Sequence, residues 1–353
     1  MKIGILTFHR CINYGSYWQA RCLADGLRAL GHDAVILDHD SRRINFAEWK
    51  CAYQPTLPTP VPPSDQLRYR DKIRRFFKAF ESLPLSARFP IDDPTTMPNF
   101  DLVIVGSDEV WNLSHPWYGG CRLFYGDGIR AERLVSYAAS FGNHDAPGGL
   151  AQDWSDKLKN FQQIAVRDDA SKTLVLSATG IEPAVVLDPC LQFPLTTTDP
   201  FDEPPLPRYI AVYGHGFSNT FSESVRRWAK QKQLPLISIG YRNDWVDRQW
   251  IDAGPHEFVH FMAGAEAVAT NFFHGCVFAL RNRKPFVCES SWYRGNKLRS
   301  LMAKVGGENH LLAEAAPAST YDRSLGQPLA SGIIDRIDHL RDSSQRYLDG
   351  ALA

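Results

Sequence analysis

A histidine between an apolar run and a helix-like run is the first residue of this chain that could do chemistry. His274 lies in the stretch "ATNFFHGCVFALRNRKPFV", residues 269–287, where residues 265–270 read as a strand end and residues 276–280 as a helix. In an open α/β sheet this junction is where ligands bind, and helix N-termini favour anions. Histidine can transfer a proton near neutral pH. Helix capping or core packing would explain the residue equally well from its position.

A second candidate follows another buried run. In "VIVGSDEVWN", residues 103–112, the apolar run stops at Gly106, and Ser107 and Asp108 then emerge at its carboxyl end. A carboxylate at this place could accept a proton from a substrate hydroxyl. Serine and aspartate are also preferred helix caps, and the motif taken by itself favours a cap of a following helical turn.

The loop after the first apolar run contains side chains suited to an oxygen-rich ligand. In "FHRCINYGSYWQA", residues 8–20, Gly15 permits close backbone approach, and Asn13 and Ser16 offer hydrogen bonds. The loop is not a GxGxxG sequence, so it gives dinucleotide binding no direct support. An ordinary strand-to-helix loop is the alternative.

An arginine follows a short apolar run in "IAVRDDASKTL", residues 164–174. The planar guanidinium of Arg167 can bind a carboxylate or a phosphate through two parallel hydrogen bonds. The alternative is a salt bridge with Asp168 or with Asp188.

Composition limits the classes of protein that these residues can serve. The chain has 353 residues, of which 44% are hydrophobic and 22% are charged, as in soluble globular proteins. Lys plus Arg equals Asp plus Glu at 39 each, so no global basic field indicates nucleic-acid binding. The seven cysteines lack ligand spacing, which argues for reduced thiols in a cytoplasm and against structural zinc. No apolar run is long enough to span a membrane.

Strand-like and helix-like runs alternate along the chain, which predicts parallel sheets in an α/β fold. A strand at 3–8, a helix at 16–30 and a strand at 34–37 form a βαβ opening. The Pro- and Thr-rich segment 194–208 interrupts the alternation, which restarts at residue 209. We therefore predict two Rossmann-like doubly wound domains facing a central cleft. They comprise an N-terminal domain (1–193), a linker (194–208), a C-terminal domain (209–325) and a C-terminal helical segment (326–353).

A basic amphipathic helix is predicted at residues 66–83, "QLRYRDKIRRFFKAFESL". Its cationic face could touch an anionic membrane surface. More often such a helix packs its apolar face on its own domain.

Seven segments in register give the chain a resemblance to the polysaccharide pyruvyl transferase family. They are "NYGSYWQA", "FFKAFESLPLS", "DLVIVGSDEVWN", "YAASFG", "VRDDAS", "VLDPC" and "ATNFFHGCVFAL" followed by "KPFV", and they lie between about residues 13 and 305. The resemblance implies a fold similar to the two-domain GT-B-like glycosyltransferases. It also implies transfer of pyruvate from phosphoenolpyruvate onto two hydroxyls of a sugar, in a surface polysaccharide or its lipid-linked precursor.

The resemblance also implies roles for individual residues. The family's proposed general acid falls on His274, and its arginine before the acidic helix start falls on Arg167. The predicted catalytic set is His274, Arg167 and Asp108, and the predicted substrate-binding set is Asn13, Tyr14, Gly15, Ser107, Gly275 and Lys297. Phe272 departs from the Ser or Arg usual in relatives, and Glu109 stands where relatives often carry Gln.

These implications define the expected partners and the competing functions. No metal or cofactor is expected, since phosphoenolpyruvate is itself the donor substrate. We expect a cytoplasmic protein, with peripheral contact at the inner face of the membrane if the acceptor is lipid-linked. A glycosyltransferase with a nucleotide-sugar donor is one rival. A non-catalytic family member that scaffolds polysaccharide assembly is the other, and Phe272 keeps it open.

Overall fold

A computed structural model describes residues 1–353 except 145, 196–207, 291–294 and 314–315. The chain divides into two compact units. Unit 1 comprises Met1–Glu48, Ser82–Thr196 and Asp338–Ala353, and unit 2 comprises Trp49–Glu81 and Thr197–Ile337. Residues 49–81, predicted in the first domain, thus group with the second unit, and the end of the C-terminal segment groups with the first. Most of the predicted linker, residues 196–207, lies outside the described residues.

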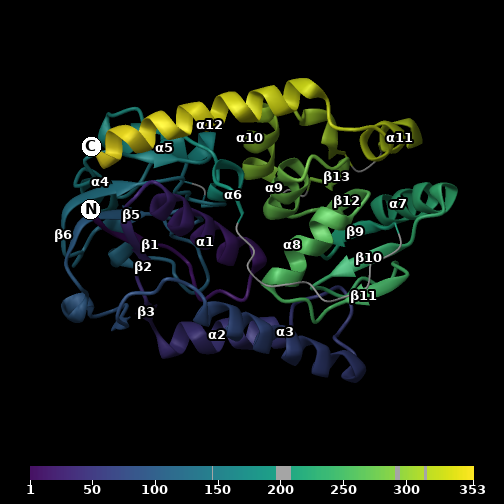
Figure 1. Ribbon diagram of the computed structural model, residues 1–353, viewed down its shortest axis with the longest axis horizontal. Coiled ribbons are helices and arrows are strands. Elements are labelled where there is room, and N and C mark those ends of the chain that lie inside the picture. The colour runs from purple at the N-terminus through teal and green to yellow at the C-terminus, as the bar shows by residue number, and fades with distance from the viewer. Residues whose placement is uncertain (145, 196–207, 291–294, 314–315) are drawn as a thin grey trace. The chain divides into compact units, whose positions relative to one another are not determined.

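Unit 1 is built on parallel strands (Figure 1). Its elements are β1 (Lys2–Leu6), α1 (Tyr14–Ala29), β2 (Asp33–Ile36), β3 (His39–Asp40), β4 (Phe89–Pro90), β5 (Phe100–Val105), β6 (Ala131–Ser136), α4 (Gln152–Leu158), β7 (Ala165–Val166), α5 (Asp169–Thr179), β8 (Ala184–Val185) and α6 (Pro189–Gln192), with short 3-10 turns at Pro94–Thr96 and Arg122–Tyr125. The main sheet has the order β2-β1-β5-β6, and β7 pairs with β8. Two helices have residues assigned to both units: α2 (Arg42–Tyr53) and α12 (Ser331–Leu352).

Unit 2 contains a six-stranded sheet in the order β11-β10-β9-β12-β13-β14, with every pairing parallel. Its elements are α3 (Pro63–Glu81), β9 (Ile210–Tyr213), α7 (Asn219–Lys232), β10 (Leu236–Ile239), β11 (Arg248–Trp250), α8 (Pro255–Gly264), β12 (Ala267–Thr270), α9 (Phe273–Arg281), β13 (Phe286–Glu289), α10 (Gly295–Val305), a 3-10 turn (Glu308–His310), β14 (Leu311–Leu312) and α11 (Ala318–Gly326). In chain order within the unit, this is the 3-2-1-4-5-6 arrangement of doubly wound nucleotide-binding folds.

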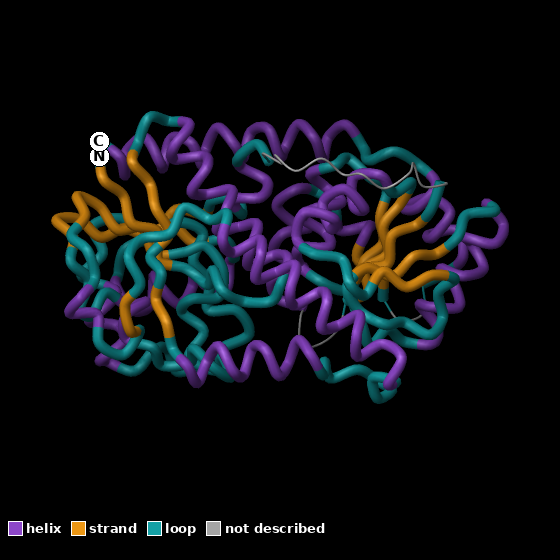
Figure 2. The backbone as a smooth tube through the Cα atoms, turned by 60° about the horizontal axis from the view of Figure 1, so that its bottom comes forward, coloured by secondary structure: helices purple, strands orange, loops and turns teal. Residues whose placement is uncertain are grey.

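Each sheet has a topological switch point, where the strand order reverses and ligands of such folds bind. In unit 1 it lies between β1 and β5, and in unit 2 between β9 and β12. In the described part of the chain, each strand pairs with strands of its own unit, and the strands are drawn in orange in Figure 2. The central strands are buried along nearly their whole length, as expected of parallel strands covered on both faces. Polar residues at the strand ends beside the two switch points are therefore candidates for ligand binding.

Helix α3 packs on unit 2, as the more usual of the two predicted roles for a basic amphipathic helix. Tyr69, Ile73, Phe76 and Phe80 are buried. The Arg75 guanidinium donates to Glu257 Oε1 over 2.9 Å. The apolar face and several of its cations are thus used inside the unit.

Candidate functional site

The switch point of unit 1 begins with the capped start of α1. Asn13 is the N-cap residue, and its Oδ1 accepts hydrogen bonds from the backbone N–H of Gly15 over 2.8 Å and of Ser16 over 3.2 Å. This geometry is the usual reason for an asparagine before a helix. The capped turn directs the hydroxyl of Ser16 to Asp108 Oδ2, over 2.8 Å. Residues after β1 and β5 are thereby joined.

The end of β5 is shaped by a glycine. Gly106 has a φ of 116°, and a Cβ there would lie 2.2 Å from the carbonyl oxygen of Tyr137. Only glycine fits this close approach. Ser107 follows fully buried; its carbonyl accepts a hydrogen bond from Thr7 Oγ1 over 2.8 Å, while its hydroxyl has no hydrogen-bond partner among the described residues. Residues 109–119 form turns, so Ser107 and Asp108 do not cap a helix there.

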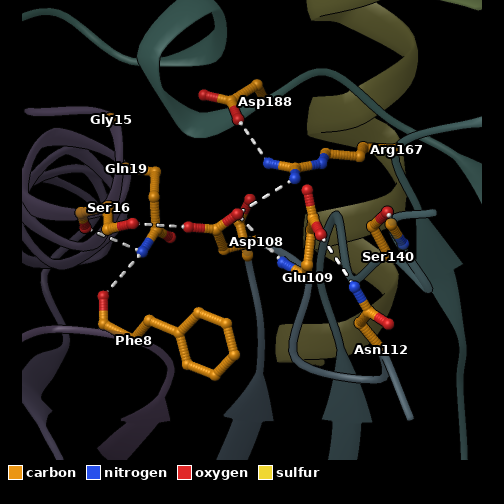
Figure 3. A network of polar contacts seen from close by, with 12 residues as sticks. Phe8, Gly15, Ser16, Gln19, Asp108, Glu109, Asn112, Ser140, Arg167 and Asp188 are labelled. Carbon is orange, nitrogen blue, oxygen red and sulfur yellow. Dashed lines mark hydrogen bonds and ion pairs between the residues drawn. The ribbon is translucent and has the colours of Figure 1, made fainter. Parts of the chain in front are cut away.

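Asp108 is instead the centre of a network of ion pairs (Figure 3). Arg167 Nη2 donates to Asp108 Oδ1 over 3.0 Å, and Arg167 Nη1 donates to Asp188 Oδ2 over 3.3 Å. The Arg167 side chain is 2% exposed, so these charges are held away from solvent. The predicted alternative of a salt bridge with Asp188 is confirmed, and the partner Asp108 is additional.

A set of short polar contacts fixes the strand end that carries Arg167. Asp168 caps α5 by accepting from Ser171 N over 2.8 Å. Its second oxygen accepts from Ser140 Oγ over 2.6 Å. Nearby, Asn112 Nδ2 donates to Glu109 Oε2 over 3.0 Å (Figure 3). These hydrogen bonds hold the residues around the Arg167 guanidinium in place.

The charge balance around Arg167 is negative. Burial lowers the pKa of Arg167, but the charges of Asp108, Asp188, Glu109 and Asp168 outweigh burial and hold this pKa above its usual range. A guanidinium already shared between two carboxylates is well suited to fixing Asp108 in place. Direct contact of Arg167 with an anionic donor stays a prediction.

Gln19 joins the first helix to this network, and no local sequence pattern indicated this role. Its Nε2 lies within hydrogen-bonding distance of Thr7 Oγ1 (2.9 Å), Phe8 O (3.2 Å) and Ser16 O (2.9 Å). Gln19 is fully buried, and these acceptors fix which way its amide faces. Its role is to tie the loop after β1 to the start of α1 (Figure 3).

The switch point of unit 2 carries His274. β12 ends at Thr270, and α9 begins at Phe273, three residues before the run 276–280 that was predicted to be helical. A Cβ on Gly275 would lie 2.0 Å from Thr270 Oγ1, so the first turn of α9 packs directly against the strand end. His274 occupies this first turn and is 9% exposed. The structure thus places it at a strand end and a helix start, as the sequence predicted.

Phe272 lies in a cluster of rings at this switch point. Its ring centroid is 5.0 Å from that of Tyr213, 5.3 Å from that of His215 and 5.5 Å from that of Tyr241. All three contacts are near-perpendicular, a favoured geometry of aromatic pairs. The phenylalanine that departs from the family pattern is therefore integrated into the packing of unit 2.

A buried lysine from α3 reaches the same ring cluster. Lys72 Nζ lies 4.3 Å from the Tyr241 ring centroid and donates to Gly240 O over 2.9 Å. Burial lowers the pKa of Lys72 to about 7, against a smaller opposite effect of Cys51. The sequence offered Lys72 only as one of several cations on a basic helix, because nothing local indicated its burial.

The predicted site residues thus fall into two groups. Asn13, Tyr14, Gly15, Ser107, Asp108 and Arg167 belong to unit 1, and Gly275, His274 and Lys297 belong to unit 2. Lys297 lies on α10 and is half-buried. The cleft predicted between the domains, and the roles of these residues, stay predictions.

None of the helices in the described part of the chain is long and apolar enough to cross a bilayer.

Comparison with solved structures gives the class of fold. MnaA from S. aureus, solved with UDP, has a TM-score of 0.50 and 12% identity, over 99% of this chain and 95% of that one. The UDP-GlcNAc 2-epimerase from Neisseria meningitidis, bound to UDP-GlcNAc, has a TM-score of 0.50 and 11% identity, over 98% of this chain and 94% of that one. The fold is thus the α/β fold of these two proteins, and the GT-B-like class predicted from the sequence is confirmed.

The family follows from the sequence match. The model for polysaccharide pyruvyl transferases matches residues 13–293, and the chain belongs to this family. Membership confirms the resemblance drawn from the seven segments and indicates a transferase of polysaccharide modification. Comparison with curated proteins finds no significant match.

Proposed function

We propose that this protein transfers the pyruvyl group of phosphoenolpyruvate to two hydroxyls of a sugar, forming a cyclic ketal. The acceptor belongs to a surface polysaccharide or its lipid-linked precursor. The observation that carries the proposal is the position of His274 in a chain of the pyruvyl transferase family: it opens α9 at the switch point of the unit 2 sheet.

The chemistry asks for an acid at the enol carbon. His274 donates a proton to the methylene carbon of phosphoenolpyruvate, which makes the adjacent carbon electrophilic. A sugar hydroxyl attacks that carbon, the carbon–oxygen bond to phosphate breaks, and the second hydroxyl closes the ketal. Of the two hydroxyl protons, one balances the proton gained by the methyl group and the other leaves with phosphate. The scheme requires no metal or cofactor.

The remaining predicted residues have roles that follow from charge and position. The first turn of α9, which contains Gly275, is together with Lys297 suited to the anionic donor. The loop residues Asn13, Tyr14 and Gly15 and the strand-end Ser107 are assigned to substrate binding. Asp108, held by Arg167 and Ser16, is assigned to the acceptor side.

The decisive experiment is incubation of the protein with phosphoenolpyruvate and a panel of sugar acceptors. We expect release of inorganic phosphate and a mass gain of one pyruvyl ketal in the matching acceptor. The absence of both, with lipid-linked and soluble acceptors alike, would contradict the proposal.

A glycosyltransferase using a nucleotide-sugar donor is the second candidate, favoured by the nucleotide-bound relatives of similar fold. Thermal-shift measurements separate the two candidates. Stabilisation by phosphoenolpyruvate and none by UDP supports pyruvyl transfer, and the reverse result supports glycosyl transfer.

If the acceptor is lipid-linked, the exposed cations of α3 provide contact with an anionic membrane surface. Arg70, Arg74 and Lys78 are exposed, whereas Arg68 is within 3.2 Å of Asp252. Replacing the three exposed cations by Gln should weaken binding to anionic liposomes and leave turnover of soluble acceptors unchanged. A variant with Lys159, Lys232 and Arg346 replaced is the control, and equal loss in both variants argues against a role for α3.

A further inference from the structure

Helix α2 exposes side chains that an amphipathic helix usually buries. Its buried positions are only Ile44 and Glu48. Phe46 is 62% exposed and Trp49 is 41% exposed, so both rings present much of their surface to solvent. Large apolar residues that are exposed singly are ordinary, but a cluster of them usually marks an interaction surface. The exposed side of α2 is therefore a candidate for such a surface.

The exposed rings share one side of the helix with cations. At the helical repeat, positions 42, 46, 49, 50 and 53 fall on the same side of α2, opposite its two buried positions. These positions carry Arg42, Phe46, Trp49, Lys50 and Tyr53. The rings of Trp49 and Tyr53 are stacked, with centroids 5.5 Å apart and planes 6° apart. We call these five residues the aromatic–cationic face of α2.

The charge of α2 has one sign on its exposed side. Arg42 and Lys50 are exposed, and the exposed Arg43 at the border of the face donates to Trp117 O over 3.2 Å. None of these three cations forms an ion pair among the described residues. The one acid of the helix, Glu48, is 8% exposed, and burial raises its pKa to about 7. The face is thus positive, although the whole chain has a net charge of zero.

An anionic lipid surface matches this face in both chemistry and charge. Helices that lie in the membrane interface combine exposed Phe and Trp with Lys and Arg. Trp and Tyr rings settle at the level of the headgroups, and cations nearby are attracted to anionic lipids. A second copy of the chain fits less well, because a two-fold contact would set the same positive charges against each other.

We propose that the aromatic–cationic face of α2 docks this protein on anionic membranes, with Phe46 and Trp49 inserted at the interface. The face lies on a different helix from the exposed cations of α3, and it adds aromatic insertion to electrostatic attraction. The inference concerns where the protein acts, so it goes beyond the proposed reaction and does not rest on the donor. A membrane position brings the protein to any acceptor that is lipid-linked.

The first test removes the aromatic rings and measures sedimentation with vesicles. The vesicles are phosphatidylcholine, alone or mixed with phosphatidylglycerol. We expect the wild type to bind the mixed vesicles, and to bind less as salt is added. The double variant Phe46→Ser and Trp49→Ser should bind about tenfold or more weakly, since less apolar surface is buried. The matched control is Leu176→Ser with Ile181→Ser, because these residues are 42% and 65% exposed.

The second test neutralises the cations of the face. Arg42→Gln with Lys50→Gln should weaken binding to the mixed vesicles by about tenfold or more and leave the weak binding to phosphatidylcholine unchanged. The control removes two exposed cations from α7, Arg226→Gln with Lys230→Gln. Equal losses in the two double variants mean that total charge, and not the face of α2, attracts the protein, and they overturn the assignment.

A third measurement reports insertion directly and remains decisive if the serine variants do not fold. Brominated acyl chains quench tryptophan fluorescence only at close range. We expect mixed vesicles with brominated chains to quench the wild type, and to quench Trp49→Phe clearly less, because this variant keeps an apolar ring but loses the reporter at position 49. Adsorption through α3 alone would leave the quenching equal in the two proteins. Equal quenching overturns the proposal.

The remaining outcomes separate the occupants and the proposals. No binding of the wild type to mixed vesicles at low salt overturns the docking surface. A wild-type dimer that dissociates on replacing Phe46 and Trp49 by Ser assigns the face to a second copy and overturns the lipid assignment. Ketal formation on a soluble acceptor without vesicle binding contradicts only this inference, and vesicle binding without ketal formation contradicts only the proposed function.

Discussion

The two switch points occupy equivalent places in two parallel sheets, yet different residue types and interactions form them. In unit 1, Asp108, Arg167 and Asp188 pair with one another in a buried network. In unit 2, His274 follows the ring cluster around Phe272, and the first turn of its helix packs against the end of β12. Ion pairs organise the switch point of unit 1. Aromatic contacts and close backbone packing organise the switch point of unit 2.

The difference favours separate roles for the two switch points in acceptor and donor binding. A network of paired charges is costly to disturb and keeps its geometry, which suits the orientation of a neutral acceptor such as a sugar. A helix start next to a histidine offers partial positive charge and a proton, which suits an anionic donor. Variants at each switch point test this difference.

The largest effect is expected at His274. Replacement of His274 by Gln keeps a similar side-chain size but removes the transferable proton, so turnover should fall by about 10²–10⁴-fold. The melting temperature should hardly change. The exposed His339→Gln provides the control. A His274→Gln protein that is less stable yet turns over normally would show a packing role instead.

Arg167 should dominate stability in unit 1. Arg167→Met leaves Asp108 and Asp188 buried without their cation, which should cost about 3–5 kcal/mol of unfolding free energy in urea titrations. The control is Arg122→Met, because its side chain is 56% exposed and such surface pairs contribute about 0–1 kcal/mol. Equal losses would show that the buried network costs no more to break than a surface ion pair.

Arg167→Lys tests the planar geometry of the guanidinium rather than its charge. A single ammonium does not reproduce the two nitrogens that face Asp108 and Asp188, so turnover should drop even though the charge is kept. Unchanged saturation by phosphoenolpyruvate, with lowered turnover, supports the positioning role. A raised KM for the donor supports direct contact.

Gly275 should be the sensitive backbone position of unit 2. A methyl group there would collide with Thr270, so Gly275→Ala should destabilise the protein by about 1–3 kcal/mol and displace His274. Gly332→Ala, where nothing lies within 4 Å, is the control, and should be neutral or slightly stabilising. A neutral Gly275→Ala would mean that the strand end and the helix can separate without cost.

Lys72 provides a prediction that is read as a pH dependence of stability. Its folded-state pKa of about 7 lies below the usual lysine value of 10.5, so between these values the folded state binds fewer protons than the unfolded state. Stability should therefore rise with pH across that window, by up to about 1.4 kcal/mol per pH unit. Lys72→Met should flatten the rise. The exposed Lys232→Met should leave it intact.

Much of the fold was predictable because its signals are local. The strand at β12, the βαβ opening and the alternation in both units follow from apolar runs and their spacing. Helix α2 escaped prediction because it buries only Ile44 and Glu48, too few residues for an apolar period. The membership of α3 in unit 2 also escaped, since its partners Glu257 and Gly240 are far along the chain.

Local sequence patterns specify which side chains stand at strand ends: His274, Asp108, Arg167 and the loop around Asn13. The family match covers the segments that carry them. The partners of these side chains depend on the tertiary fold. Arg167 and Asp108 are 59 residues apart, and they meet because Ala139, after β6, forms parallel bridges with both Asp108 and Val166. Burial is likewise a property of the whole fold, which is why Glu48 and Lys72 acquire unusual proton affinities that no local pattern announces.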